Sequence, residues 1–199
     1  ELGATETLQT DFISSVSHEF KTPINAIEGY AALLQGHQQT PEEQETYIEK
    51  ILFNTRRLST LTGNILLLSK INNQSISPQS SVFRLDEQVR QAILALERKW
   101  EEKDIQFDVD LDKITYTGYE KLLIHVWTNL IDNAIKFDPQ GGSIRLRMCR
   151  QPDGILFTID DNGPGIPPEE QERIFHKFYQ SDNSREVDGN GLGLALVKQ

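Results

Sequence analysis

Cysteine, basic charge and long apolar runs are all scarce in this chain of 199 residues. The only cysteine, Cys149, cannot form a disulfide within the chain, which favours a reducing compartment such as the cytosol. Thirty acidic residues against twenty basic ones give a formal net charge of -10, which argues against nucleic acid as a partner. No apolar run approaches the roughly 20 residues that span a bilayer, and no signal peptide opens the chain. Because the chain begins at Glu1 rather than Met, we expect it to be a piece of a longer protein.

Two stretches with helical periodicity come first. Apolar residues recur at steps of three and four over residues 5–35 and again from about residue 41 to 72. Between them Gly36 ends the first helix, and Thr40-Pro41-Glu42-Glu43 supplies a capping residue, a proline at the first helical position and a carboxylate three residues after the cap. We therefore predict a helical hairpin. Its leftover apolar side chains predict a four-helix bundle built from two chains, and hence a homodimer.

A polar segment from Asn72 to Ser81 has a proline and no periodicity, as linkers do. Beyond it we predict strands at 82–85, 105–111, 143–150 and 155–160, and helices at 86–103, capped by Asp86, and at 119–136. Interleaved strands and helices of this kind predict an α+β domain with helices on one face of a mixed sheet. The sequence thus divides into domains at 1–76 and 77–199.

His18, in the run Ser17-His18-Glu19-Phe20-Lys21-Thr22-Pro23, is the first candidate for chemistry. It lies off the apolar stripe, so its imidazole is expected to face solvent, where one ring nitrogen can attack an electrophile. Glu19 is the nearest carboxylate to hold the other ring proton, although adjacent helical residues do not face each other. Thr22 lies one turn on, on the same face as His18. Taken alone, the pattern is more typical of a surface histidine.

Polar residues interrupt the apolar helix predicted at 119–136. Asn129 and Asn133 lie one turn apart, and Lys136 follows almost one turn later on the same flank. Amide oxygens suit Mg²⁺, which takes further oxygens from substrate phosphates, and a lysine can meet phosphate charge directly. A polar flank that simply faces water is an equally good interpretation of this spacing.

Two glycine-rich segments and an aromatic one follow. Asp161, Gly163 and Gly165 come directly after a predicted strand, where a carboxylate can accept a hydrogen bond from an exocyclic amine and glycines admit a flat ring; an ordinary turn is the alternative. Gly191 and Gly193 precede an apolar helical start whose N–H groups can bind phosphate. Between them, Phe175-His176-Lys177-Phe178-Tyr179 leads into a polar stretch from Gln180 to Asn190, which we expect to be mobile unless a ligand orders it, as lids are. The aromatic residues can hinge such a lid, and local core packing is an equally good interpretation of them.

The order of these motifs is more specific than any one of them. His-Glu-x-x-Thr-Pro on a hairpin, then Asn-x-x-x-Asn, Asp-x-Gly-x-Gly, Phe-x-x-Phe and Gly-x-Gly-x-Gly-Leu, resembles the two-component sensor histidine kinases over residues 5–199. The resemblance implies a dimerisation and histidine-phosphotransfer domain at 1–76. It also implies an ATP-binding catalytic domain at 77–199, an α+β sandwich of the fold shared with gyrase and the heat-shock ninety chaperones.

The resemblance also implies roles for individual residues. His18 looks like the phosphoacceptor, Glu19 like the acidic partner that helps to deprotonate it, and Thr22 like the residue that positions water when a response regulator is dephosphorylated. The implied nucleotide-binding residues are Asn129, Asn133, Lys136, Asp161, Gly163, Gly165, Phe178, Gly191 and Gly193. Among them Asn133 is implied as the Mg²⁺ ligand, Asp161 as the residue that recognises adenine, and Gly191 and Gly193 as neighbours of the triphosphate.

The implied function is an ATP-dependent protein histidine autokinase with ATP and Mg²⁺ as cofactors. It would phosphorylate His18, pass the phosphoryl group to an aspartate of a response regulator, and also dephosphorylate that regulator. The alternative is an ATPase or nucleotide-binding interaction module of the same superfamily without phosphotransfer. The expected location is the cytoplasm, as a fragment of an inner-membrane-anchored sensor that meets the membrane only through a region absent from this chain.

Two features depart from the family pattern. Gln180 stands where many relatives carry a basic residue, so Arg185 or Lys177 is expected to supply that phosphate contact. The family also continues past the last glycine motif with further strands, whereas this chain ends at Gln199.

Overall fold

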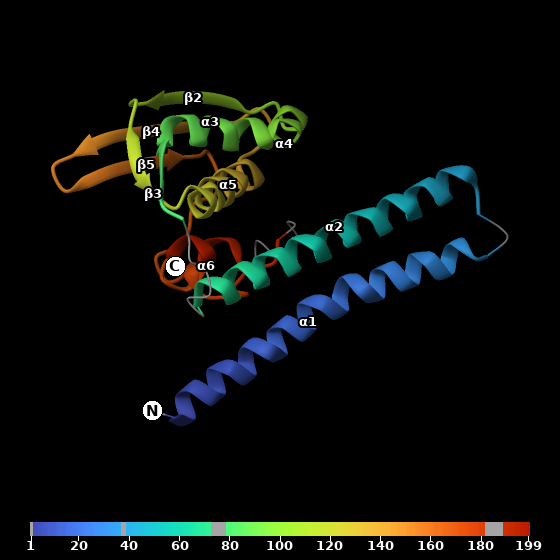
Figure 1. Cartoon of the computed structure of the whole chain (residues 1–199). Helices are drawn as coiled ribbons and strands as arrows, with labels where there is room; N and C mark the ends of the chain where they lie inside the picture. Colours follow the sequence, from blue (N-terminus) through green and yellow to red (C-terminus); the bar gives the residue numbers. More distant parts are fainter. Residues whose placement is uncertain (1, 37–38, 73–78, 182–188) are drawn as a thin grey trace. The chain divides into compact units, whose positions relative to one another are not determined.

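The computed structural model describes residues 2–36, 39–72, 79–181 and 189–199, and the chain divides into two compact units (Figure 1). One unit combines Glu1–Asn72 with Lys177–Leu192, and the other combines Asn73–His176 with Gly193–Gln199. Residues 73–78 of the predicted linker and 182–188 of the predicted lid lie outside the described residues.

The first unit is built on a hairpin of two long helices, α1 (Leu2–Leu34) and α2 (Pro41–Asn72), which run side by side. The turn into α2 has the predicted capping box. The Thr40 N–H donates to Glu43 Oε2 at 2.8 Å, and the Glu43 N–H donates to Thr40 Oγ1 at 3.2 Å. The predicted helical hairpin, with Pro41 as the first helical residue, is confirmed.

The hairpin of one chain covers only part of its apolar surface. Leu61 and Leu68 of α2 are 1% exposed, and Pro23 of α1 is fully buried. Several large apolar side chains of the two helices remain in contact with water: Ile13, Ile24, Leu33, Ile48, Leu52, Phe53 and Leu66. A helix surface this apolar is typical of a face that packs against another protein surface.

The second unit holds the remaining elements in an α+β arrangement. These are β1 (Ser81–Arg84), α3 (Leu85–Ala95), α4 (Glu97–Glu102), β2 (Gln106–Leu111), β3 (Thr115–Gly118), α5 (Glu120–Phe137), β4 (Ser143–Gln151), β5 (Gly154–Asp160), the 3-10 turn Arg173–Phe175 and α6 (Gly193–Lys198). In the larger sheet β2 pairs parallel with β4, and β4 pairs antiparallel with β5. The predicted mixed sheet is therefore confirmed.

A second, smaller sheet was not predicted. In it β3 pairs antiparallel with β1, with Phe83 opposite Tyr116. Thr115–Gly118 is a short run without alternation, so only its pairing with β1 makes it a strand.

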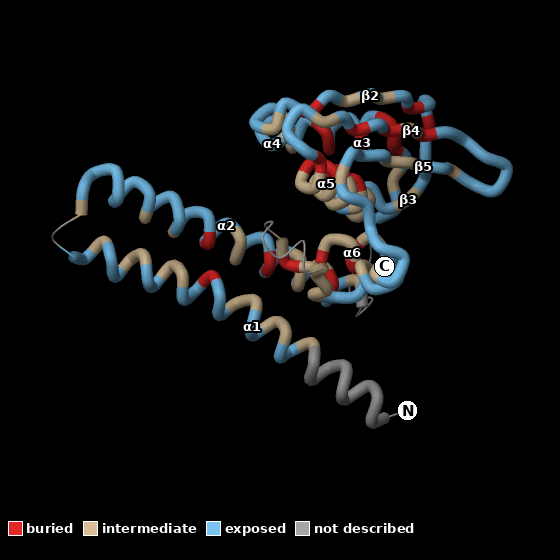
Figure 2. Tube along the Cα trace, turned by 180° about the vertical axis from the view of Figure 1, so that it is seen from behind, coloured by how far each residue is buried: buried red, intermediate tan, exposed pale blue. Residues whose placement is uncertain are grey.

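The core lies between the sheet and α3 and α5, where buried residues gather (Figure 2). Along β4, Ile144, Leu146 and Met148 are buried, whereas the residues between them are more exposed. Val89 of α3 and Ile131 of α5 are fully buried opposite this face. Burying each such side chain contributes about 1.5–3 kcal/mol relative to leaving it in water.

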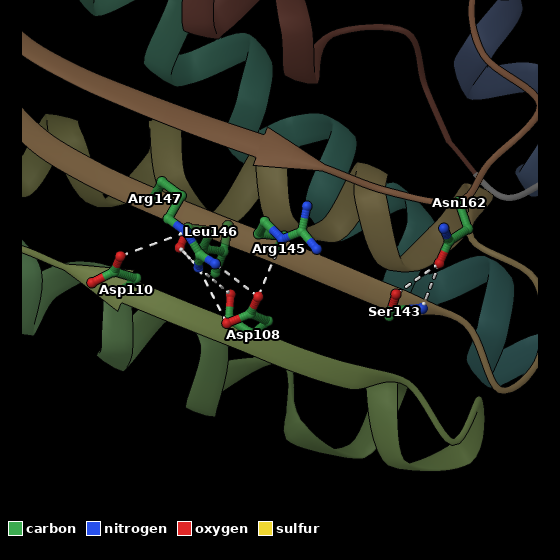
Figure 3. Close-up of polar contacts among 7 residues, drawn as sticks. All are labelled: Asp108, Asp110, Ser143, Arg145, Leu146, Arg147 and Asn162. Atoms are coloured by element: carbon green, nitrogen blue, oxygen red, sulfur yellow. Dashed lines mark hydrogen bonds and ion pairs between the residues drawn. The ribbon is translucent and has the colours of Figure 1, made fainter.

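The other face of the sheet carries charge (Figure 3). Asp108 of β2 accepts from Arg145 Nε at 3.1 Å and from Arg147 Nη2 at 2.8 Å, both on β4. Arg147 Nε also lies 3.6 Å from Asp110 Oδ2. The hydrogen bonds from Arg147 and then Arg145 lower the pKa of Asp108 below its usual value. These charged side chains are partly exposed to solvent, whereas the helices pack on the opposite, apolar face.

The prediction that Asp86 caps the third helix is wrong. Helix α3 begins at Leu85, so Asp86 lies in its first turn, and its side chain is turned into the protein with 1% exposure. Its Oδ1 accepts from Arg84 Nε at 2.7 Å and from the Ile114 N–H at 3.3 Å. These hydrogen bonds lower the pKa of Asp86, and the bond from Arg84 has the larger effect. The carboxylate thus ties the β1–α3 junction to the segment before β3.

This ion pair predicts a dependence of stability on pH. Because the folded-state pKa of Asp86 lies below the unfolded value of about 3.9, its contribution is present above about pH 4 and is lost as the pH falls through the folded value. At neutral pH we expect Asp86→Asn to lower the free energy of unfolding by about 1–3 kcal/mol. The difference from the native chain should shrink towards about pH 3 in urea titrations. Asp153→Asn, at an exposed turn position, is the matched control, and a gap that widens in acid would contradict this account.

Candidate functional site

The His18 side chain is 81% exposed, as the sequence predicted. Its Nδ1 lies 4.0 Å from Oε1 of Glu19, too far for a hydrogen bond but close enough for electrostatic coupling. Thr22 is exposed one turn further on, and its hydroxyl donates to the His18 carbonyl oxygen at 3.3 Å. His18 and Thr22 are therefore exposed on α1, whereas Glu19 lies partly buried beside them. Nε2 of His18 is the ring nitrogen away from the carboxylate.

Glu19 is held by a residue that the sequence analysis did not single out. Arg57 of α2 donates from Nη2 to Glu19 Oε2 at 3.3 Å, and both side chains are largely buried, with 25% and 22% exposed. The same Arg57 nitrogen donates to the carbonyl oxygen of Gly189 at 3.3 Å. Arg57 is one of several basic residues on α2, and only the pairing of the helices places it beside Glu19.

The segment Lys177–Leu192 of the first unit is joined at its two ends. The Phe178 N–H donates to the Gly191 carbonyl oxygen at 2.8 Å, and Gln180 Nε2 donates to the Gly189 carbonyl oxygen at 2.8 Å. A Cβ at Gly191, where φ is +62°, would lie 2.7 Å from the Phe178 carbonyl carbon, so this approach requires glycine. Gln180, the departure from the family pattern, thus closes the base of this segment.

Phe178 packs against an aromatic ring of α1 that also has a cationic neighbour. Its ring centroid lies 5.6 Å from that of Phe12, and Lys177 Nζ lies 5.2 Å from the Phe12 centroid. Arg185, the other basic residue expected to replace the missing phosphate contact, lies outside the described residues.

In the second unit, Asn129 and Asn133 lie half-buried on α5. Asn129 Nδ2 donates to the His125 carbonyl oxygen at 2.7 Å. The Asn133 side chain makes no hydrogen bond within the part of the chain that the structure describes, so its amide oxygen is available to a ligand. Lys136 Nζ lies 5.0 Å from the centroid of the Phe137 ring.

Gly193 lies against α5, the asparagine helix that carries Asn129 and Asn133. A Cβ at this position would lie 2.7 Å from Asn129 Oδ1. Because α6 begins at Gly193 and packs against α5, the absence of a side chain there sets how closely the two helices approach. The sequence predicted both residues near a nucleotide, and the structure gives their proximity a steric reason.

The loop after β5 approaches the end of α5. Asp161 is exposed, and its Oδ1 accepts from the Gly163 N–H at 2.8 Å. A Cβ at Gly163 would lie 2.7 Å from Asp161 Oδ1 and 3.1 Å from the Phe137 carbonyl oxygen, so the loop needs glycine there. Gly165 has φ of +73°, which also favours glycine.

Among the described residues no group of three or more His, Cys, Asp or Glu side chains forms a metal centre. The donors on α5 nevertheless fit Mg²⁺, since this ion keeps several waters and takes other oxygens from phosphates, and needs few protein ligands. The Asn133 amide oxygen is the donor that this arrangement leaves available.

Two known protein families match the two parts of the chain that carry these features. Residues 8–74 match the model of the His Kinase A (phospho-acceptor) domain, which covers the hairpin that carries His18. Residues 118–199 match the model of the histidine kinase-, DNA gyrase B-, and HSP90-like ATPases, which covers α5 and both glycine motifs. The chain belongs to the sensor histidine kinases. It is their catalytic core, a phosphotransfer hairpin followed by an ATPase domain, and the predicted fold class is confirmed.

Relatives of this kinase core are similar along nearly its whole length. It is 37% identical over 191 residues to the heme sensor protein HssS of Staphylococcus saprophyticus, with 96% of this chain and 41% of HssS covered. It is 32% identical over 196 residues to the sensor-like histidine kinase SenX3 of Mycobacterium tuberculosis, with 97% of this chain and 48% of SenX3 covered. The kinase core therefore spans less than half the length of these relatives. Among its described helices, none has the length and apolarity to span a membrane.

Solved structures share the fold of the kinase core. Full-length ShkA in complex with AMPPNP is 27% identical, with a TM-score of 0.66 and 94% of this chain and 40% of that chain covered. ThkA in complex with the response regulator protein TrrA is 24% identical, with a TM-score of 0.71 and 89% of this chain and 52% of that chain covered.

The contact between Gly193 and Asn129 predicts a coupled effect on stability. Because an added methyl group meets Asn129 Oδ1, we expect Gly193→Ala to lower the free energy of unfolding by about 1–3 kcal/mol. The loss should be smaller in an Asn129→Ala background, where the clash is gone. Urea unfolding of the four proteins without nucleotide measures this coupling. Equal losses in both backgrounds would mean that the contact is not formed.

Proposed function

We propose that this kinase core transfers the γ-phosphoryl group of ATP to Nε2 of His18 and then to an aspartate of a response regulator. The observation that carries the proposal is the exposed imidazole with a carboxylate beside Nδ1. In this step the Nε2 lone pair attacks the γ-phosphorus, a P–N bond forms, the bond to the oxygen that bridges the β- and γ-phosphates breaks, and ADP leaves.

Glu19 supports this attack through the other ring nitrogen. As Nε2 forms its bond, positive charge develops on the ring. The carboxylate near Nδ1 stabilises that charge and, once it closes to hydrogen-bond distance, accepts the Nδ1 proton. Arg57 keeps Glu19 in place from α2 at 3.3 Å, so the carboxylate does not need to be ordered at the moment of transfer.

The second unit supplies the nucleotide. Asp161 would accept a hydrogen bond from the 6-amino group of adenine, with Gly163 and Gly165 leaving room for the base. Asn133 would hold Mg²⁺ and Asn129 would lie beside it. A bound Mg²⁺ ion neutralises phosphate charge. Lys136 and Gly193 would contact the phosphates. The complex of ShkA with AMPPNP supports nucleotide binding by this fold.

Two protein partners follow from the proposal. The complex of ThkA with the response regulator protein TrrA supports a regulator as the acceptor. Thr22, exposed one turn from His18, would orient water when the regulator is dephosphorylated. The apolar side chains that the hairpin leaves exposed support a homodimer that forms a four-helix bundle. Because ATP and response regulators are cytoplasmic, we place this part of the protein in the cytoplasm, beside a membrane-anchored sensor region.

Phosphorylation of His18 is tested with ATP labelled at the γ-phosphate. The native chain should acquire a label that is lost in acid and retained in base, as expected for a phosphoramidate. His18→Gln should reduce this label to background, because glutamine has no nucleophilic ring nitrogen. His125→Gln, which changes an exposed histidine of α5, should keep it. Label that persists in His18→Gln would exclude this acceptor, and ATP hydrolysis with no protein label would favour an ATPase.

Thr22 is expected to separate the two activities. Thr22→Ala should leave labelling of His18 within about twofold of the native rate, since among the described residues the hydroxyl bonds only to its own helix. The same change should slow dephosphorylation of the regulator by about tenfold. Thr22→Ser, which retains a hydroxyl, should restore most of that activity. The measurement follows loss of label from a regulator that accepts the phosphoryl group in a transfer screen. Equal loss of both activities would assign Thr22 a structural role.

A further inference from the structure

Asp138 is a buried carboxylate that none of the preceding roles uses. It follows α5 directly and is only 2% exposed. Its Oδ1 accepts a hydrogen bond of 2.6 Å from the N–H of Asn162, which lies immediately after Asp161. A charged acceptor makes a stronger hydrogen bond than a neutral one. The end of the asparagine helix is thus bonded to the loop that carries the proposed adenine-binding aspartate.

The side chain of Asn162 provides a second attachment for this loop. Its Oδ1 accepts from the N–H of Ser143 at 2.8 Å and from the Ser143 hydroxyl at 2.9 Å, at the start of β4 (Figure 3). Asn162 is therefore held on two sides, by α5 through its N–H and by β4 through its side chain. The peptide plane between Asp161 and Asn162 contains the N–H that Asp138 binds, so this hydrogen bond restricts ψ of Asp161 and the direction of its side chain.

The backbone of Asp138 is itself fixed. Lys103 Nζ donates to the carbonyl oxygens of Ile135 at 2.9 Å, Lys136 at 2.8 Å and Asp138 at 2.8 Å. The ammonium group thereby satisfies carbonyls that the end of a helix leaves without partners. Asp138 is therefore a rigid anchor from which a loop can be positioned.

Only one of the two carboxylate oxygens of Asp138 is hydrogen-bonded within the described part of the chain. Asp138 Oδ2 is buried without a hydrogen-bond partner among the described residues, and it lies so close to Gly142 that a Cβ there would clash. A buried carboxylate oxygen without a partner is costly. The stabilising contact that offsets this cost is the hydrogen bond from the Asn162 N–H to Oδ1 of Asp138.

We propose that Asp138 is a positioning residue for adenine recognition. By holding the Asn162 N–H, it fixes the orientation in which Asp161 presents its carboxylate to the 6-amino group of the base. This inference rests on the proposed function, because it assumes that Asp161 recognises that amino group.

The test compares ATP with the purine riboside triphosphate that lacks the 6-amino group. The native kinase core should bind ATP more tightly, and the ratio of the two dissociation constants measures recognition of the amine. Asp138→Leu, of similar size but without an acceptor, should reduce this ratio by about tenfold while affinity for the analogue stays within about threefold. Asp138→Asn retains an acceptor oxygen and should preserve the ratio. Ser143→Ala, which leaves the Ser143 N–H in place, is the matched control at the other attachment and should preserve it as well.

The outcomes separate this inference from the function on which it rests. If the native chain binds both nucleotides equally, the role of Asp161 fails. If the native chain prefers ATP and folded Asp138→Leu keeps that preference, the positioning role of Asp138 is overturned. Amide exchange provides a second measurement that does not depend on the folding of the leucine variant. The Asn162 amide should be protected in the native chain and in Asp138→Asn, and unprotected exchange in the native chain would overturn the proposal.

Discussion

Burial of one face of α5 determines the geometry of the nucleotide-binding unit. Trp127, Ile131, Ala134 and Ile135 face the core. With 3.6 residues per turn, this leaves Asn129, Asn133 and Lys136 together on the opposite side of the helix. The apolar contacts fix the rotation of α5 about its own axis, and this rotation sets the direction of all three polar side chains together. Contact between Gly193 and Asn129 then sets the position of α6, and Asp138 at the end of α5 sets the loop after β5.

In the proposed function the hairpin has a different role, because it presents a reactive side chain instead of enclosing a ligand. His18 lies on the outside of α1, and the carboxylate beside it is supported from α2 by Arg57. The Glu19 carboxylate is thus held by a neighbouring helix, while the His18 imidazole stays in water. This arrangement combines a fixed charge next to the ring with open access to the ring.

The parts of the structure that depend on local pattern could be predicted from the sequence. The capping box at Thr40 and Glu43, the alternation along β4 and the exposure of His18 all follow from residue spacing. Contacts that depend on how distant segments pair could not be predicted in this way. Arg57 meets Glu19 only through the register of two helices, and Thr115–Gly118 becomes a strand only beside β1.

Asp86 shows that tertiary contacts can also override a local sequence pattern. Its position before an apolar helix is typical of a capping residue, and a cap would leave the carboxylate near solvent. The neighbouring Arg84 and the Ile114 N–H offer stronger partners inside the protein, so the side chain turns inward and the helix begins one residue earlier. For the candidate site, sequence patterns identified residues with suitable chemistry, whereas the anchors that orient them, such as Asp138, emerged only with the tertiary structure.

The exposure of His18 also bears on which molecules can share it. A nucleophile at the bottom of a pocket accepts reactants of one shape, because the walls select them. A ring that stands on the side of a helical rod with 81% of its side chain in water imposes no such shape. In the proposed function, two unlike surfaces can therefore approach the same nitrogen in turn, one to donate the phosphoryl group and one to accept it. Selection between these two surfaces must then come from the helix surface around the His18 ring. Substitutions on α1 and α2 can therefore alter which surface binds while the imidazole stays the same.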